Sequence, residues 1–512
     1  MNIKTWKVAL LLFGSGTCAL VYQMTWLREF RLIFGASTGA SAAVLAIFMG
    51  GLGLGSLLLG HRADKAARPL GFYANLELLI AASAALTPLL LWAVRQGYIA
   101  TGGESVLGDW GATLVRLLLA SLVLLVPTFL MGGTLPAAAR SVESESDLGR
   151  RHLAFLYGAN TLGAVTGSAF ATFYMMEVFG NRKSLWLACL LNAGVAMIAR
   201  NLSATTSSAD PVPDGVAPAP AGSPTEPAVA RTAPSEPPLA AAHDATVMPE
   251  EAGGNVPAGF VLAAAGIVGF AFLLMELVWY RMLSPILGGS TFTFGLILAV
   301  ALLGIGLGGA AYAVFRGNRP ATLTGFAFTC ALEALFIAVP YALGDELAVL
   351  AMLLRSLSSV GFWGLVFTWT IITTIAVLPA AFMSGVQFPL LIALLGRGRA
   401  SVGRHVGIAY AYNTVGAIAG SLAGGFGLLP LLGAVGAWRL VVVLLALLAF
   451  AALLLAARGA GVLGKAASSA GAAIGAAADH AKYFAARAAT PALCGVAAVA
   501  LLLADGPTAA WR

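Results

Sequence analysis

Three glutamates lie within long apolar stretches, and their side chains are the best suited to chemistry. Glu77 and Glu333 each follow a leucine and match each other in the two halves of the sequence, and Glu276 interrupts the apolar segment 271–279. A carboxylate at membrane depth is costly, so it normally faces the interior of a helical bundle and has a partner there. We therefore expect each glutamate either to bind a cation or proton, or to form a hydrogen bond or ion pair between helices.

Two asparagines are the next candidates. Asn160 and Asn413 lie in segments otherwise rich in Gly, Ala, Ser and Thr, and they follow Tyr157 and Tyr410 by three residues. Asparagine side chains in such helices can bridge neighbouring helices or can line a cavity. The flanking tyrosines fit both alternatives, so the sequence leaves them open.

These residues belong to an internal repeat. The segment 20–28 returns as 273–281, with Trp and Arg at the same places and Gln23 at the position of Glu276. The two asparagines have the same offset (413 − 160 = 253 and 281 − 28 = 253). A constant offset across separate motifs predicts that the chain consists of two copies of one unit.

Composition predicts that both copies lie in a membrane. The chain of 512 residues is 59% hydrophobic and 10% charged, whereas soluble domains carry about 25% charged residues. The net charge of +7 comes from Lys and Arg that flank apolar runs, which indicates topology signals and argues against a nucleic-acid surface. The four cysteines show no CxxC spacing, so we expect no metal site and no disulfide framework.

The predicted fold is all-α and polytopic, with two parallel six-helix repeats like those of major facilitator transporters. Six spans per copy give both copies the same orientation in the bilayer. The expected divisions are a first membrane repeat (1–200), a disordered Pro/Ala-rich linker (201–256), a second membrane repeat (257–457) and an Ala/Gly-rich tail (458–512). The tail contains a short apolar run that could form a thirteenth span. The excess of Lys and Arg in alternate loops predicts a cytoplasmic N-terminus.

Two further patterns concern helix packing. The glycine ladder that begins at Gly51 returns at Gly304, and such small residues let helices approach closely in lipid. Pro127 and Pro136, in the fourth helix expected over about 112–139, are matched by Pro379 and Pro389 in the tenth helix expected from about 363. Interrupted helices at matching positions in two halves favour a binding site at the interface of the repeats.

Several motifs occurring together resemble a known family. The loop from Gly60 to Pro69 resembles the signature loop of the major facilitator superfamily. The segments LVYQMTWLR, GLGLGS and LYGANTLGAVTGS are similar to the membrane part of bacterial spermidine-synthase-like fusion proteins, also called fused major facilitator/spermidine synthase proteins. The resemblance covers most of residues 8–455.

The resemblance implies a polyamine or related small cation as the substrate and the bacterial inner membrane as the location. In that family a soluble aminopropyltransferase-like domain commonly follows the membrane part. The cofactor loop and acidic residues of such a domain are absent from this sequence, so no aminopropyl-transfer activity carries over. We find no catalytic motif and expect no cofactor.

The leading hypothesis is a transporter-like membrane protein that binds a small cation between its two repeats. The alternative is a non-transporting membrane anchor or scaffold for a soluble aminopropyltransferase-like domain or partner. The candidate binding residues are Glu77, Glu333, Glu276, Gln23, Asn160, Asn413, Tyr157 and Tyr410.

Overall fold

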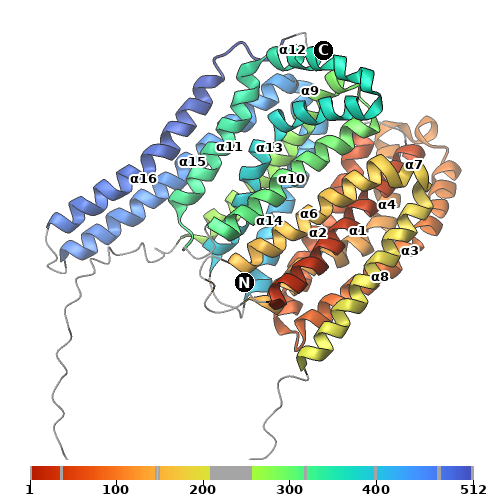
Figure 1. The fold of residues 1–512 in the computed structure, drawn as a ribbon, viewed down its shortest axis with the longest axis horizontal. Coiled ribbons are helices and arrows are strands. Elements are labelled where there is room, and N and C mark those ends of the chain that lie inside the picture. Colours follow the sequence, from red (N-terminus) through yellow and green to blue (C-terminus); the bar gives the residue numbers. More distant parts are fainter. Residues whose placement is uncertain are drawn as a thin grey trace, which may run out of the picture.

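The structure is a computed structural model, and it describes residues 3–34, 38–143, 147, 150–207, 256–315, 320–396, 401–469 and 474–508. These residues form helices joined by short turns, with no β-strand among them (Figure 1). Most of the predicted linker lies outside the described residues.

The two halves repeat one order of helices. The first half contains α1 (Ile3–Phe34), α2 (Thr38–Lys65), α3 (Pro69–Ala100), α4 (Glu104–Gly132), α5 (Thr134–Val142), α6 (Arg151–Phe170), the π-helical turn η1 (Ala171–Met175), α7 (Met176–Val178) and α8 (Gly180–Ser207). The second half contains α9 (Ala258–Leu287), α10 (Thr291–Phe315), α11 (Leu323–Leu343), α12 (Glu346–Leu354), the 3₁₀ turn η2 (Arg355–Val360), α13 (Phe362–Leu395), α14 (Val402–Ala423), the π-helical turn η3 (Gly424–Leu428) and α15 (Leu429–Ser469). A last helix, α16 (Ile474–Leu501), follows.

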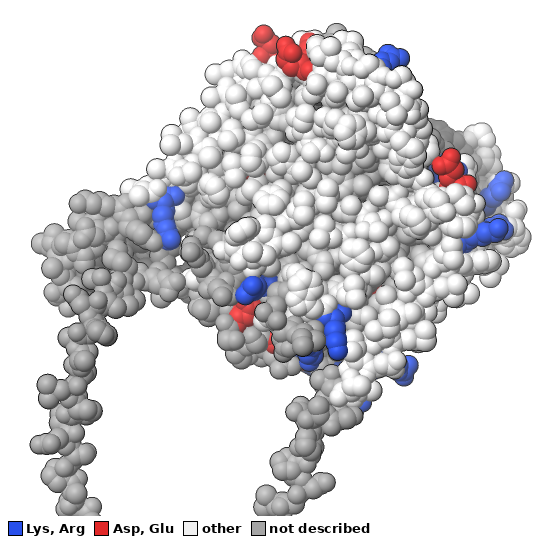
Figure 2. Space-filling view, viewed as in Figure 1, with Lys and Arg blue, Asp and Glu red and all other residues white. Residues whose placement is uncertain are grey.

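The helices are suited to a bilayer. Ten helical stretches in the described residues are long and apolar enough to cross a membrane, and the last of them, Val402–Gly459, contains α14 and most of α15. On the face drawn in Figure 2, the visible charged residues lie towards the two ends of the helices and leave an uncharged band between them. The predicted polytopic α-helical membrane fold is confirmed.

α6 is not among the ten apolar stretches. It packs between α1 and α10, and only Thr166 and Phe170 of its residues are exposed. Because α6 is packed against protein along two sides, it can carry the polar residues Tyr157 and Asn160 away from lipid.

Some expected boundaries differ from the structure. α8 continues to Ser207, so the first residues of the predicted linker are helical, and α15 continues past residue 457. The interruption expected in both halves occurs only in the first, where Gly133 separates α4 from α5. α13 stays one helix through Pro379 and Pro389, so the prolines alone do not break it.

The short apolar run expected near the C-terminus belongs to α16, a helix of 28 residues. α16 packs against α11 and α15. After it, the backbone N–H of Thr508 donates a 2.9 Å hydrogen bond to Asp345, in the turn that follows α11.

We call the end of the bundle where α1 begins the near end and the opposite end the far end. The last described residues therefore lie at the far end, away from the N-terminus (Figure 1).

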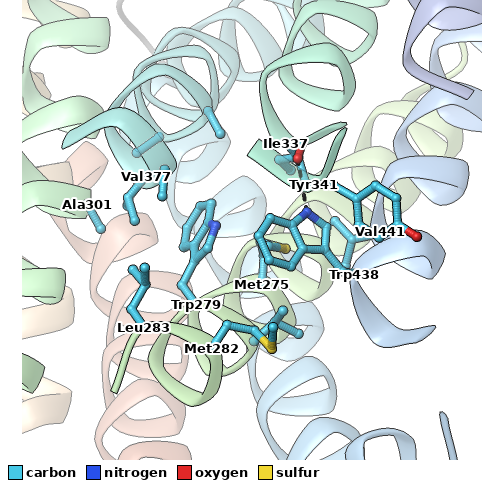
Figure 3. Close-up of a cluster of buried hydrophobic side chains, with 14 of the residues drawn as sticks. Met275, Trp279, Met282, Leu283, Ala301, Ile337, Tyr341, Val377, Trp438 and Val441 are labelled. Atoms are coloured by element: carbon cyan, nitrogen blue, oxygen red, sulfur yellow. Dashed lines mark hydrogen bonds between the residues drawn. The ribbon is translucent and has the colours of Figure 1, made fainter. Parts of the chain in front are cut away.

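Each half has its own apolar core around a repeated tryptophan. Trp26 and Trp279 are each 1% exposed. The indole N–H of Trp26 donates to the Thr87 hydroxyl at 3.0 Å. Figure 3 shows Trp279 in the second core, with Val377 and Leu283 on one side of its ring and Met275 and Trp438 on the other. Because each half buries its own tryptophan, each half is a packed unit.

The glycine ladders place helices in contact both within and between the halves. A Cβ on Gly55 of α2 would overlap the backbone oxygen of Phe129 on α4, in the same half. A Cβ on Gly53 would instead lie 2.8 Å from the Thr414 side chain on α14, in the other half. The second ladder is similar, because Gly306 of α10 faces Leu162 of α6 across the halves at 3.0 Å. The predicted role of these glycines in close helix packing is confirmed.

Polar contacts close the two halves against each other at the near end. The carboxylate of Asp64 accepts hydrogen bonds from the backbone N–H groups of Gly403 and Arg404 at 2.9 and 2.8 Å. It thereby caps the N-terminus of α14, where a negative charge is favourable. The guanidinium of Arg150 donates to the Gly396 oxygen at 3.0 Å and lies 3.2 Å from His405 Nδ1.

Arg150 is held by a carboxylate of its own half. Its Nη1 lies 2.9 Å from Glu143 Oε1, and both side chains are buried. Burial raises the pKa of Glu143 to about 7, although the charge of Arg150 opposes this rise. The first half thus contributes both Asp64 and Arg150 to the contact with the second half.

We predict that Gly55→Ala lowers the stability of the protein, whereas Gly194→Ala does not. The new methyl group at residue 55 would meet backbone of α4, and overpacking of this kind costs about 1–3 kcal/mol. A Cβ on Gly194, in α8, meets nothing within 4 Å. The midpoint of thermal unfolding in detergent measures both effects, and equal midpoints for the two variants would contradict the helix contact.

Candidate functional site: a cavity between the two halves

A cavity of about 250 Å³ lies between the halves. Its walls come from α1 to α6 and α8 of the first half and from α9, α10, α13 and α14 of the second. A second pocket of about 200 Å³ shares Gln23, Leu45, Phe48, Leu273 and Glu276 with it. The second pocket also includes Arg31, in the last turn of α1. Together the two pockets run from the middle of the bundle towards its far end.

The structure brings most of the predicted residues together in this cavity. The lining includes Glu77, Glu276, Gln23, Asn160, Asn413, Tyr157 and Tyr410. Glu333 is not among the residues that line either pocket. The two glutamates that correspond in the repeat therefore have different surroundings.

Glu77 is fully buried and faces the cavity from α3. Ser15, Tyr73 and Asn192 lie beside its carboxyl group, but neither carboxylate oxygen has a hydrogen-bond partner of good geometry among the described residues. The Asn192 amide instead donates to the backbone oxygen of Glu77 at 2.8 Å. Glu77 thus has the capacity to bind a group that enters the cavity.

Glu276 lies where the two pockets meet. It is half-buried on α9, and it has no hydrogen-bond or ion-pair partner within the part of the chain that the structure describes. Gln23, its counterpart in the repeat, lines both pockets from α1. A carboxylate from one half and an amide from the other thus lie at the same level of the cavity.

Glu333 forms a bond between two helices of its own half. Its carboxylate accepts a 2.6 Å hydrogen bond from the Gln387 side chain, which α13 contributes. One residue is inserted in this part of the second half, so Gln387 corresponds to Thr134 or Leu135, and the Thr134 hydroxyl donates to the Met131 oxygen at 2.8 Å. Neither position of the first half offers Glu77 an amide. Of the two roles left open for Glu333, the structure favours the interhelical bond.

The remaining predicted residues contribute to both packing and lining. The Asn413 amide donates to the Ala265 oxygen of α9 at 3.1 Å, so it bridges two helices while it lines the cavity. The rings of Tyr157 and Tyr410 both pack against Phe388, with ring-centroid separations of 4.9 and 5.8 Å. All three residues lie in the halves of their helices that are towards the near end. They form an aromatic floor on this side of the cavity.

The sequence analysis did not identify several lining residues. Phe388 and Asn192 are the most important, because one completes the aromatic floor and the other holds the backbone of α3. Phe388 lies next to Pro389 of the matched proline pair, which could have indicated it. The equivalent of Asn192 in the second half is Leu445 (192 + 253 = 445). Because no polar residue is repeated at this position, the repeat could not indicate Asn192.

Comparison with known proteins identifies the fold. A bacterial homologue of the iron transporter ferroportin in an outward-facing state covers 90% of this chain and 100% of its own, with 12% identity and a TM-score of 0.53. A structure of a bacterial ferroportin homologue with soaked iron gives 11% identity, 90% and 99% coverage and the same TM-score. The human organic anion transporter MFSD10 has 14% identity, 88% and 100% coverage and a TM-score of 0.48. The sequence matches no protein-family profile and no curated protein.

The first two likenesses cover nearly the whole chain. They show that the chain has the fold of major-facilitator-type membrane transporters. At this level of identity they show the fold alone, so the site must be argued from its own residues.

We predict that Glu333→Leu destabilises the protein and that the matched variant Glu77→Leu does not. Loss of Glu333 leaves the buried amide of Gln387 without its partner, which costs about 1–3 kcal/mol. Loss of Glu77 breaks no side-chain hydrogen bond of good geometry. Thermal unfolding in detergent measures both, and a similar decrease for both variants would show that Glu77 is also a structural residue.

Proposed function

We propose that this protein is a transporter that binds a small organic cation in the cavity between its halves. The observation that carries the proposal is the charge of the lining. Among the described residues, the cavity of about 250 Å³ is lined by two carboxylates, Glu77 and Glu276, and by no Lys, Arg or His. A carboxylate in a low-dielectric site requires a positive partner, and in this cavity a bound cation supplies it.

The types of side chain favour an amine over a metal ion or an anion. Within the part of the chain that the structure describes, the cavity lining contains no His or Cys, the side chains that transition metals such as iron commonly use together with carboxylates. Phe48, Phe272 and the aromatic floor present ring surfaces, which attract ammonium groups. An anion would meet two carboxylates and no compensating base. We therefore do not propose iron, the metal named for the ferroportin homologue, as the substrate of this chain.

A polyamine is the most specific form of this proposal. Two carboxylates in one cavity suit a linear molecule with two or more ammonium groups. The resemblance of the membrane repeats to spermidine-synthase-like fusion proteins supports the same choice, and it also supports a soluble aminopropyltransferase-like partner.

We also propose an orientation, with the chain in a bacterial inner membrane and its N-terminus in the cytoplasm. Lys and Arg in the loops support this assignment. The closed near end, with Asp64 and Arg150, would then face the cytoplasm. The pocket that contains Arg31 would lead to the outside, so a substrate would enter this conformation from outside.

We expect purified protein in proteoliposomes to take up labelled spermidine or putrescine saturably. Glu276→Gln should reduce the initial rate at least about tenfold, because loss of one charged hydrogen-bonding partner costs about 1.5–3 kcal/mol. Glu77→Gln should do the same. Uptake with and without an imposed proton gradient measures whether protons are coupled to the movement.

Glu177→Gln is the matched control, because Glu177 is exposed at the far end. It should transport at the wild-type rate. No uptake of either amine by folded wild-type protein would contradict the proposal and would favour the anchor or scaffold for a soluble enzyme. Unchanged rates in both Glu77→Gln and Glu276→Gln would remove these residues from the site.

A further inference from the structure

The connection between α5 and α6 holds a cluster of possible metal ligands outside the cavity. Glu143, Asp147 and His152 each offer one ligand atom, and these atoms lie within 4.8 Å of one another. The cluster lies at the near end, beside the contact that Arg150 makes with the second half. None of the three residues lines either pocket.

One carboxylate oxygen of this cluster has unused bonding capacity. The Glu143 side chain is fully buried, and its Oε1 accepts a 2.9 Å hydrogen bond from Arg150. Its Oε2 is buried without a hydrogen-bond partner among the described residues. A buried carboxylate oxygen without a partner is costly and rare, so this atom indicates a group that is bound here.

The other two candidate ligands, Asp147 and His152, are held close together by local contacts. Both oxygens of Asp147 accept backbone N–H groups, from Arg151 and His152, each at 2.8 Å. His152 Nδ1 lies 3.1 Å from Asp147 Oδ2. Metal bonds of about 2.0–2.2 Å place neighbouring ligand atoms about 3.0–3.5 Å apart. The His152–Asp147 pair therefore has the spacing of two ligands on one ion.

The charges also suit a cation. Once Glu143 is ionised, it and Asp147 bring two negative charges, and the Arg150 guanidinium lies beside Glu143 Oε1. One imidazole nitrogen with two carboxylates is a ligand set for borderline ions such as Zn²⁺, Mn²⁺, Fe²⁺ or Co²⁺, whereas Mg²⁺ and Ca²⁺ prefer oxygen alone. The geometry points to a binding site for one divalent transition-metal ion at Glu143, Asp147 and His152.

This site is independent of the proposed transport function. An ion bound to Glu143 Oε2 would hold the end of α5 to the start of α6. Since Arg150 follows Asp147 by three residues and reaches Gly396 and His405, the ion would stabilise the segment that closes the near end.

The test is a titration of the full, tag-free, metal-depleted chain in detergent with Co²⁺. We expect visible d–d absorption bands that saturate at one ion per chain, together with a higher midpoint of thermal unfolding. His152→Gln should abolish both changes. His61→Gln is the matched control, because His61 is exposed at the same end and outside the cluster, and it should bind Co²⁺ as the wild type does.

Two results would overturn the assignment. One is the absence of saturable Co²⁺ bands in folded wild-type protein, or their persistence in His152→Gln. The other is their loss in Glu276→Gln with His152→Gln unaffected, which would place the ion in the central cavity. Glu143→Gln provides a second variant, and it should lose the Co²⁺-dependent rise of the unfolding midpoint even if its midpoint without metal is lower.

Discussion

Close contact between helices of opposite halves is the constraint on which the rest of the structure depends. Gly53 of α2 meets Thr414 of α14, and Gly306 of α10 meets Leu162 of α6. Lipid supplies no hydrophobic drive between helices, so such contacts rely on small residues and tight packing. These two contacts hold the halves together along two edges. Between them, α1 and α9 face each other across the cavity that contains Gln23 and Glu276.

The cost of a buried carboxylate then explains how the two copies have diverged. In the second half Glu333 is satisfied by Gln387, and it contributes to the packing of α11 against α13. In the first half the carboxylate of the corresponding Glu77 has no hydrogen-bond partner of good geometry among the described residues, and it faces the cavity. Glu276 and Gln23 show the reverse asymmetry, because here the second half has kept the charge. Each half thus supplies one carboxylate to the cavity, from different positions of the repeat.

The sequence was sufficient to predict the architecture, because the repeat, the apolar runs and the glycine ladders are local patterns. It also identified seven residues that line the cavity. It could not separate Glu77 from Glu333, because their roles depend on a partner more than fifty residues away, at Gln387. The contacts of Asp64 and Arg150 with the second half were missed for the same reason, since loop charges indicate topology but not their partners.

The most direct test of the account is equilibrium binding of spermidine to the detergent-purified protein, measured by calorimetry without any membrane gradient. We expect saturable binding at one molecule per chain. Glu77→Gln and Glu276→Gln should each weaken it at least about tenfold, because each removes a charged partner of the ammonium groups. Glu333→Gln, in folded protein, should leave the affinity unchanged. Equal affinity in the wild type and both cavity variants would contradict the claim that these carboxylates bind the cation.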